Sequence, residues 1–225
     1  MYEQLNIRVQ EDVEQLPFRV RAVRPEEAAQ VYDLRCEAYS SRAMYLDHFK
    51  ASLAKPDSVD LNPYAVTFVA VCKNSGDVLG TIRVACNADV DDLLPPETPS
   101  DPCIEGPFAF VDRFAIRRSA PNSVSLALLK SVWLWTLGRD ARWLVALAGA
   151  PLARHYQRWA GLSVRANGQS FIVKADLAEP VFLVAARVAE AHTQLMDRNP
   201  EFVNNFLSRV HPDINVMGTK MPISH

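Results

Sequence analysis

Glycine is scarce in this sequence, with 8 residues among 225. Neither G-x-x-x-x-G-K-[ST] nor G-x-G-x-x-G occurs, so nucleotide hydrolysis and dinucleotide binding lack the glycine-rich loops that usually support them. G-x-S-x-G, which marks an exposed nucleophilic serine, is also missing. The 5 histidines have no metal-ligand spacing, and we therefore expect no metal site.

Other shortages narrow the class of protein further. The 4 cysteines form no C-x-x-C pair, which favours reduced thiols and a cytoplasmic location. No apolar run approaches ~18 residues, so we expect no membrane-spanning segment. Residues 1–20 carry charges throughout, unlike a secretory signal. The net charge of −2 gives no general attraction to nucleic acid.

The apolar and charged fractions, 49% and 22%, are those of an ordinary globular domain. Alternating and helical patterns predict a strand, two helices and a hairpin, followed by a long loop rich in Pro and Asp. The predicted ranges are 18–24, 25–39, 43–54, 64–73, 77–87 and 88–107. Strand 108–116, helix 122–138, strand 142–148 and helix 151–160 follow. This spacing indicates a right-handed crossover, so we expect 108–116 and 142–148 to be parallel neighbours.

The last part of the chain is expected to be mostly helical after a strand near 170–175. Val181, Val184, Val188, Ala191 and Leu195 recur at helical spacing, which predicts a helix from 180 onward. A short helix is predicted over 200–209. We therefore expect a lead-in segment at 1–17, one α/β domain over 18–175, and a C-terminal helical appendage, 176–225, packed on that domain.

A basic turn, R-R-S-A-P-N-S, joins strand 108–116 to the apolar helix after it. Backbone N–H groups at a helix N-terminus attract anions, and Arg117, Arg118, Ser119 and Asn122 add donors around this one. The turn is therefore either an anion site or an ordinary capped helix with two solvated arginines.

Four further motifs precede this turn or overlap the strand before it. L-R-C-E-A-Y, residues 34–39, lies in the first predicted helix, and D-S-V-D, residues 57–60, supplies paired acids. G-T-I-R, residues 80–83, lies on the second strand of the hairpin. F-V-D-R-F, residues 110–114, lies on the strand before the turn.

In this order the motifs resemble those of GNAT-fold synthases that make N-acyl amino acids and acyl-homoserine lactones (autoinducers). Their patterns are L-R-x-x-x-[FY], D-x-x-D, G-x-x-R and E-x-x-R-[FL]. The glycine-poor turn also resembles this branch, because acetyl-CoA-dependent members carry R/Q-x-x-G-x-G/A there. The resemblance covers roughly residues 18–165. The long segment before the first helix is more similar to N-acyl amino acid synthases than to lactone synthases.

This resemblance implies an α/β fold, a GNAT-like mixed central sheet flanked by helices, with the donor's phosphopantetheine between two splayed parallel strands. It implies transfer of a long-chain acyl group from acyl carrier protein, or from acyl-CoA, to the amine of an amino acid. No permanently bound cofactor is implied. Acyl carrier protein and the amino-acid acceptor are the partners.

The resemblance also assigns roles to residues. The substrate-binding candidates are Arg35, Tyr39, Asp57, Asp60, Arg83, Arg113 and Phe114. Arg117, Arg118, Ser119 and Asn122 would lie around the donor's phosphates. Asp112 and Tyr156 are the catalytic candidates, as proton acceptor for the amine and proton donor to the leaving thiolate. Phe110 stands where the family has an acid, so the proton acceptor is expected near Asp112, directly or through a water relay.

Each assignment competes with a structural interpretation. Arg83 and Arg113 lie on apolar strands and need an anionic partner, which is either an aspartate of this chain or the carboxylate of the acceptor. Tyr156 is followed by Gly161 one residue later than the family spacing, and it also fits a packed helix face. The large aromatic residues either line an acyl tunnel or fill the core; they are Phe108, Phe110, Phe114, Trp133, Trp135, Trp143 and Trp159.

Three other functions fit parts of the sequence: a lactone synthase, an acetyl-CoA-dependent N-acetyltransferase, and a non-catalytic GNAT-fold domain that binds an acyl chain or a carrier protein. The missing glycines argue against acetyl-CoA. Phe110 in place of the acid favours the non-catalytic alternative.

Overall fold

The computed structural model describes residues 15–40, 42–87, 93–174 and 176–216. Its first half contains β1 (Phe18–Ala22), η1 (Pro25–Glu27), α1 (Ala28–Ser40), α2 (Asp47–Ser52), β2 (Ala65–Cys72) and β3 (Val78–Asn87). The central part contains β4 (Phe108–Ile116), α3 (Ser123–Leu137), β5 (Trp143–Ala148) and α4 (Ala150–Trp159). The last part contains β6 (Ser163–Val164), η3 (Ala166–Gly168), β7 (Ser170–Phe171), β8 (Val181–Arg187), α5 (Val188–Arg198), α6 (Pro200–Phe202) and η4 (Val203–Leu207).

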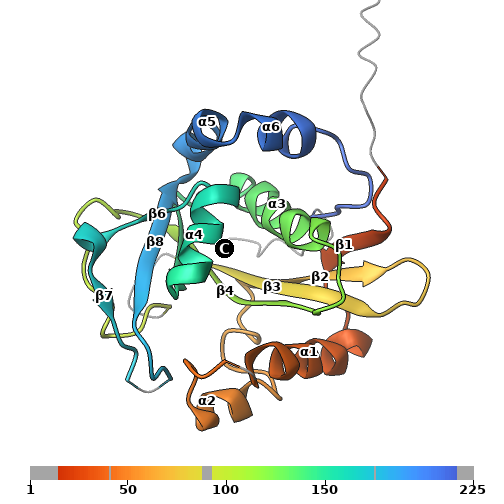
Figure 1. Cartoon of the computed structure of the whole chain (residues 1–225), viewed down its shortest axis with the longest axis horizontal. Coiled ribbons are helices and arrows are strands. Elements are labelled where there is room, and N and C mark those ends of the chain that lie inside the picture. Colours follow the sequence, from red (N-terminus) through yellow and green to blue (C-terminus); the bar gives the residue numbers. More distant parts are fainter. Residues whose placement is uncertain (1–14, 41, 88–92, 175, 217–225) are drawn as a thin grey trace, which may run out of the picture.

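One mixed sheet organises these elements in the order β1-β2-β3-β4-β5-β8-β6, with β7 paired to β8. Helices α1 and α2 lie on one side of it and α3 and α4 on the other, while α5 and α6 form an outer layer beyond α3 (Figure 1). All of the pairings are antiparallel except that of β4 with β5, as far as the named strands are described. The layered α/β architecture expected from the sequence is confirmed.

Strands β4 and β5 diverge after a short common stretch. They pair in parallel from Phe108–Trp143 to Val111–Ala146, and both strands continue beyond the last of these pairs. Each strand therefore has a C-terminal part that has left its neighbour. This geometry confirms the prediction of parallel neighbours that splay toward their C-terminal ends.

A β-bulge in β4 lies where the splay begins. Arg83 of β3 faces Asp112, whereas Thr81 faces Ala115, so one extra residue is present on β4. Arg113 has a φ of 51°, in the left-handed region that non-glycine residues rarely occupy. A bulge of this kind bends the strand and re-aims its side chains, which here are those of the F-V-D-R-F motif.

Helix α3 packs closely on the middle of the sheet, as expected from its nearly continuous apolar sequence. Gly80, the glycine of G-T-I-R, permits this approach. A Cβ added at Gly80 would lie 2.8 Å from side-chain atoms of both Ile116 and Val124. The glycine of the motif therefore has a packing role between β3 and α3.

The expectation of a helix from 180 onward is wrong for its first part. Val181–Arg187 forms β8, which pairs antiparallel with β5, and helix α5 begins only at Val188. Most of β8 is buried, because the strand is covered on both faces. A continuous apolar run of this kind fits a doubly covered strand better than one face of a helix. The helical spacing appeared because Val181 and Val184 of the strand were read together with Val188, Ala191 and Leu195 of the helix.

Two other expectations concern the segments around the domain. Most of the predicted lead-in 1–17 lies outside the described residues, although Leu16 is buried in the main core. The same holds for 88–92 of the long loop, whereas 93–107 packs onto the molecule. Asp101 fixes this segment by accepting hydrogen bonds from Arg165 Nε (3.1 Å) and the Ala166 N–H (3.0 Å). Over the residues described, no helix has the length and apolar character needed to cross a bilayer.

Candidate functional site

A cavity of about 250 Å³ lies at the point where β4 and β5 separate. Seven residues predicted from the motifs line it, and they come from α1, the loop before β2, β3, β4 and α4: Tyr39, Asp57, Arg83, Asp112, Arg113, Phe114 and Tyr156. Segments distant in the sequence thus converge on one space. Arg35 and Asp60 lie outside this wall and support it.

The charged side of the cavity is an ion-pair network centred on Arg83, whose side chain is 2% exposed. Asp112 accepts from Arg83 at both carboxylate oxygens, from Nε at 2.8 Å and from Nη2 at 2.6 Å. Nη1 of Arg83 lies 2.5 Å from Asp57 Oδ1 and 3.0 Å from Asp60 Oδ1. All three nitrogens of this guanidinium therefore face aspartates of the chain itself.

The network extends to the neighbouring arginines. Arg35, also buried, binds Asp60 (3.1 Å), and Arg113 binds Asp57 (2.9 Å). Asp57 also accepts a hydrogen bond from the backbone N–H of Asp60 (2.9 Å), and Asp60 accepts one from the backbone N–H of Asp57 (3.3 Å). The D-x-x-D spacing thus forms a compact turn. Its two carboxylates bridge three arginines.

Burial opposes ionisation of Asp57, but hydrogen bonds and charge from Arg83, with a further bond from Arg113, outweigh it, so the pKa of Asp57 lies well below its ordinary value. For Arg83, burial likewise opposes the charge, and Asp112 and Asp57 outweigh it and raise the pKa above its ordinary value. Both groups are therefore charged near neutral pH. For Arg83, the structure shows the ion-pair alternative.

Arg113 differs from Arg83 because part of its guanidinium has no partner. Its Nη2 binds Asp57, but its buried Nη1 has no hydrogen-bond partner within the described structure. The guanidinium carbon lies 4.8 Å from the ring centroid of Phe49, which holds the group against α2. Arg113 lines the cavity, and an unsatisfied, charge-bearing donor on such a residue is suited to bind an anion such as a carboxylate if the guanidinium turns toward the open space.

The sequence motifs missed the aromatic lining contributed by α2 and the segment before it. Tyr45 stacks on Phe49 with ring centroids 5.2 Å apart, and Tyr39 lies 4.7 Å from Tyr45. Tyr39 also donates from its hydroxyl to the Phe114 carbonyl (3.3 Å), which joins α1 to the end of β4. The i, i+4 spacing of Tyr45 and Phe49 was the available signal in the sequence.

The rest of the cavity wall is mainly apolar, with Asp176 as a charged residue within it. This part of the wall combines the described part of the long loop with β4, β5, β8 and the segment before β8, through Leu93, Pro95, Phe110, Leu147, Val173, Leu177 and Val181. Phe110 and Asp112 both line the cavity, two residues apart on β4. The boundary between the apolar side and the charged side therefore runs across this strand.

A second cavity, of about 780 Å³, adjoins the first. The two share Tyr45, Phe114, Gly149 and Leu152, and the larger one is further lined by Ile116, Ser125, His155 and Phe182, among others. It therefore extends along the splay toward the N-terminus of α3. Burial lowers the pKa of His155, and its Nε2 atom has no hydrogen-bond partner among the described residues.

Tyr156 lies on α4, beside the first cavity and 2% exposed. Burial, with a smaller effect of nearby Tyr39, raises the pKa of its phenol well above the ordinary value. The group therefore keeps its proton near neutral pH, as a proton donor to a thiolate must. Its ring also packs in the main core, with its centroid 6.1 Å from that of Phe114.

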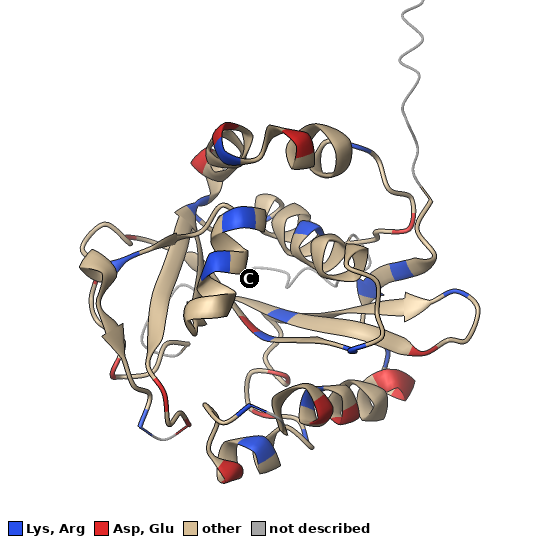
Figure 2. Ribbon diagram, in the orientation of Figure 1, with Lys and Arg blue, Asp and Glu red and all other residues tan. Residues whose placement is uncertain are grey.

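The turn before α3 presents its predicted donors unequally. Arg117 folds back, donating from Nε to the Val78 carbonyl (3.2 Å) and lying 3.6 Å from Glu37. Arg118, Ser119 and Asn122 are exposed, and no side chain caps the helix at Asn122. Figure 2 shows the basic residues of this turn and of α4, the two elements that flank the splay. None of the four predicted donors lies in the described wall of either cavity.

Solved structures with the same arrangement are known. FeeM, an N-acyl amino acid synthase from uncultured soil microbes, has a TM-score of 0.60 at 16% identity, over 80% of this chain and 96% of its own. BjaI, a CoA-dependent acyl-homoserine lactone synthase, has a TM-score of 0.55 at 17% identity, over 80% and 89%. A protein of the GNAT family from Desulfovibrio desulfuricans has 0.52 at 19%, over 76% and 98%.

The chain has the GNAT fold. The fold implied by the motifs is thereby confirmed, at identities low enough that the likeness is one of fold. No protein-family model matches the sequence, and no curated protein does either. In the described part of this GNAT fold, no group of three or more His, Cys, Asp or Glu residues is arranged to hold a metal ion.

Proposed function

We propose that this GNAT-fold protein is an N-acyltransferase that moves a long-chain acyl group from a phosphopantetheine thioester to the amine of an amino acid. The observation that carries the proposal is the divided cavity at the splay. One side offers the Arg113 guanidinium and the carboxylates of Asp57 and Asp112, and the other offers a mainly apolar wall. A charged, small acceptor and an apolar acyl chain need these two environments.

The acceptor fits the charged side as a zwitterion. Its carboxylate would bind Nη1 of Arg113, because that donor is unpaired whereas Arg83 is saturated by aspartates. Its amino group would face Asp112, which is 25% exposed and whose oxygens can accept more bonds than the two from Arg83. The three arginines and three aspartates of the network balance in formal charge, so a zwitterion leaves that balance unchanged.

The donor fits the splay. Its pantetheine arm would lie in the larger cavity between β4 and β5, and its phosphate near the exposed N-terminus of α3. The ammonium group of the acceptor first passes a proton to Asp112, directly or through water, and the neutral amine attacks the thioester carbonyl carbon. The new C–N bond forms as the C–S bond breaks, and Tyr156 donates its proton to the leaving thiolate. The second proton of the nitrogen returns through water to the Tyr156 phenolate, which leaves the amide and a free thiol. Backbone N–H groups of β4 beyond the last pair with β5 would polarise the carbonyl.

Acyl carrier protein is the proposed carrier of the donor. The turn 117–122 lacks the glycines that let a backbone close around a pyrophosphate, so free coenzyme A would be held weakly. Contacts with an acidic carrier protein would supply the missing affinity.

The decisive experiment incubates the purified protein with acyl thioesters, on carrier protein and on coenzyme A, and with a panel of amino acids. We expect thiol release and an N-acyl amino acid by mass spectrometry, with carrier-bound thioesters preferred. S-adenosylmethionine as the sole amine tests a lactone synthase. If no thioester is consumed with any amine, the enzyme proposal fails, and binding of acyl carrier protein without product would support a non-catalytic domain.

A further inference from the structure

Phe110 is a buried aromatic residue in the wall of the cavity. It lies on β4 between Ala85 of β3 and Val145 of β5, its cross-strand neighbours. It is 8% exposed, and it forms part of the cavity wall. The side chain that replaces the acid of the family motif is thus apolar and also faces the open space.

Behind Phe110 the structure is filled. Phe108, Trp143, Val145, Leu183 and Ala185 form a buried cluster with Phe110, and Phe108 and Val145 are fully buried. Leu93, Leu94 and Ile104 of the long loop pack against this cluster from outside. Because close-packed interiors leave little unused volume, a ligand entering from the splay cannot pass the ring of Phe110 without displacing it.

The direction in which an acyl chain would lie follows from the charges. Asp112, Asp57 and Arg113 occupy the wall beyond Phe110, and burying methylene groups against them is unfavourable. Leu147, Val173, Leu177 and Val181 also line the cavity, with Asp176 among them, and each methylene buried against these apolar side chains favours binding roughly fourfold. The chain would therefore run along the apolar wall toward Phe110.

We infer that Phe110 closes the end of the acyl chamber and sets the longest acyl chain that the protein accepts. The inference rests on the proposed function and adds chain-length selection to it. The position that carries an acid in the family pattern thus belongs here to the acyl-binding wall.

The test compares Phe110→Leu with Phe108→Leu. Both residues lie on the same strand and in the same cluster, but only Phe110 lines the described cavity, so the control matches the packing change without opening the chamber. Relative kcat/KM is measured for a series of thioesters of increasing chain length. We expect Phe110→Leu to move the optimum by about two or more carbons toward longer chains. Phe110→Trp should move it toward shorter ones, and Phe108→Leu should leave it unchanged.

An unchanged optimum in Phe110→Leu and Phe110→Trp, or the same shift in Phe108→Leu, overturns the inference. Circular dichroism of each variant establishes that it is folded, and Phe110→Met replaces Phe110→Leu if the latter is not. If the wild-type protein turns over no thioester, the proposed function has failed independently. The affinity of each variant for fatty acids of increasing length is then measured by calorimetric titration. A preferred chain length that is unchanged in the Phe110 variants, or that shifts equally in Phe108→Leu, overturns the inference.

Discussion

Arg83 and Arg113 contact the same aspartate and yet have different capacities for a ligand. The Arg83 guanidinium is enclosed by Asp57, Asp60 and Asp112, so its removal leaves carboxylates without their counter-charge. Arg113 has one contact to Asp57 and one nitrogen with no partner in the described structure. We therefore expect the first residue to stabilise the site and the second to bind the acceptor.

Substituting the two arginines separately distinguishes these roles. Arg83→Ala should lower the free energy of unfolding by about 3–5 kcal/mol, because breaking a buried network strands its charges. Arg113→Ala should remain folded and raise KM for the amino acid by roughly tenfold or more, since a hydrogen bond to a charged group is worth about 1.5–3 kcal/mol. Urea unfolding and steady-state kinetics of both variants check this. If Arg83→Ala has a normal unfolding curve but no turnover, Arg83 binds the carboxylate of the acceptor instead of stabilising the fold.

The sequence indicated which residues gather at the site but not how they pair. The order and spacing of the motifs brought Tyr39, Asp57, Arg83, Asp112 and Arg113 together correctly. Which carboxylate faces which guanidinium depends on the bulge at Arg113, and a one-residue irregularity within a strand leaves no mark in an apolar pattern. For this reason the two interpretations of Arg83 could not be separated from the sequence.

At the scale of single elements, the N-terminus of α3 and the turn before it determine how a donor could be held. The two arginines of the turn are not equivalent, because Arg117 is held by Val78 and Glu37 whereas Arg118 is exposed. Arg118 is therefore the residue with which to test recognition of an acidic carrier. Arg117 would confound such a test through its structural contacts.

Arg118→Glu should raise KM for an acyl carrier protein thioester and leave kcat nearly unchanged. The effect should be largest at low ionic strength and diminish toward 1 M salt, where screening acts within about 3 Å. Arg19→Glu is the matched control, because Arg19 is exposed on β1, at the far edge of the sheet. If Arg118→Glu has the same KM as the wild-type protein at every salt concentration, the turn does not recognise the carrier and serves only as the start of helix α3.

The sequence predicted helices and strands correctly where a segment had one hydrophobic pattern throughout. The prediction failed where a strand pattern and a helix pattern follow each other directly. Helix α3 and strands β4 and β5 were placed within a residue or two of their observed bounds. The whole segment after Pro180 was predicted as a helix, although it contains a strand followed directly by a helix. No turn separates β8 from α5, so the sequence offered no glycine or proline to mark the change.

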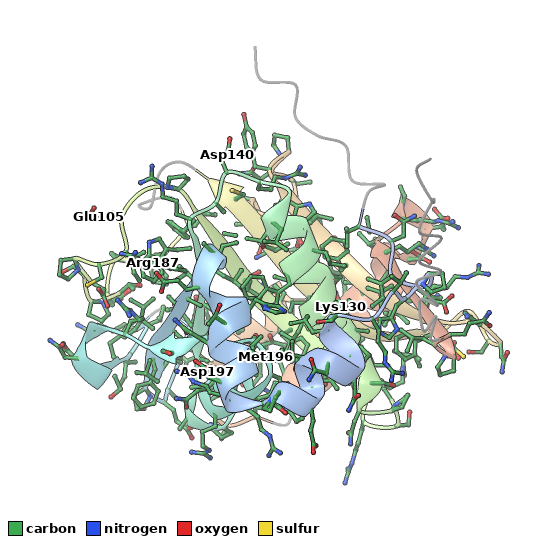
Figure 3. The ribbon with its side chains drawn as sticks, turned by 90° about the horizontal axis from the view of Figure 1, so that it is seen from above. Glu105, Lys130, Asp140, Arg187, Met196 and Asp197 are labelled. Carbon is green, nitrogen blue, oxygen red and sulfur yellow. The ribbon has the colours of Figure 1, made fainter. Side chains whose placement is uncertain are left out.

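Across the whole molecule, the C-terminal segment ties distant parts together. Lys130 of α3 is buried and donates from Nζ to the carbonyls of Phe206 (2.9 Å) and Arg209 (2.6 Å). Figure 3 shows Lys130 on α3 beneath the C-terminal helices. Further on, the backbone N–H of Asn215 donates to the Val20 carbonyl (2.8 Å), so the segment runs beside β1.

Lys130→Met should loosen this attachment. Two carbonyls lose a charged donor, and we expect the free energy of unfolding to fall by about 1–3 kcal/mol with faster proteolytic cleavage within 199–216. Leu137→Gln on the exposed end of the same helix should change it by no more than about 0.5 kcal/mol. Equal stability and equal cleavage rates in Lys130→Met and wild type would show that the carbonyls find other donors.

The parting of β4 from β5 also has a mechanical consequence. A sheet transmits force through the hydrogen bonds between its strands, and β1–β4 are joined to β5–β8 through four residue pairs, from Phe108–Trp143 to Val111–Ala146. Beyond the last of these pairs, β4 and β5 are not paired with each other. A ligand arm laid in the splay would bridge the two strands beyond the last pair. A bound ligand would therefore stiffen the molecule where β4 and β5 have no backbone hydrogen bonds to each other.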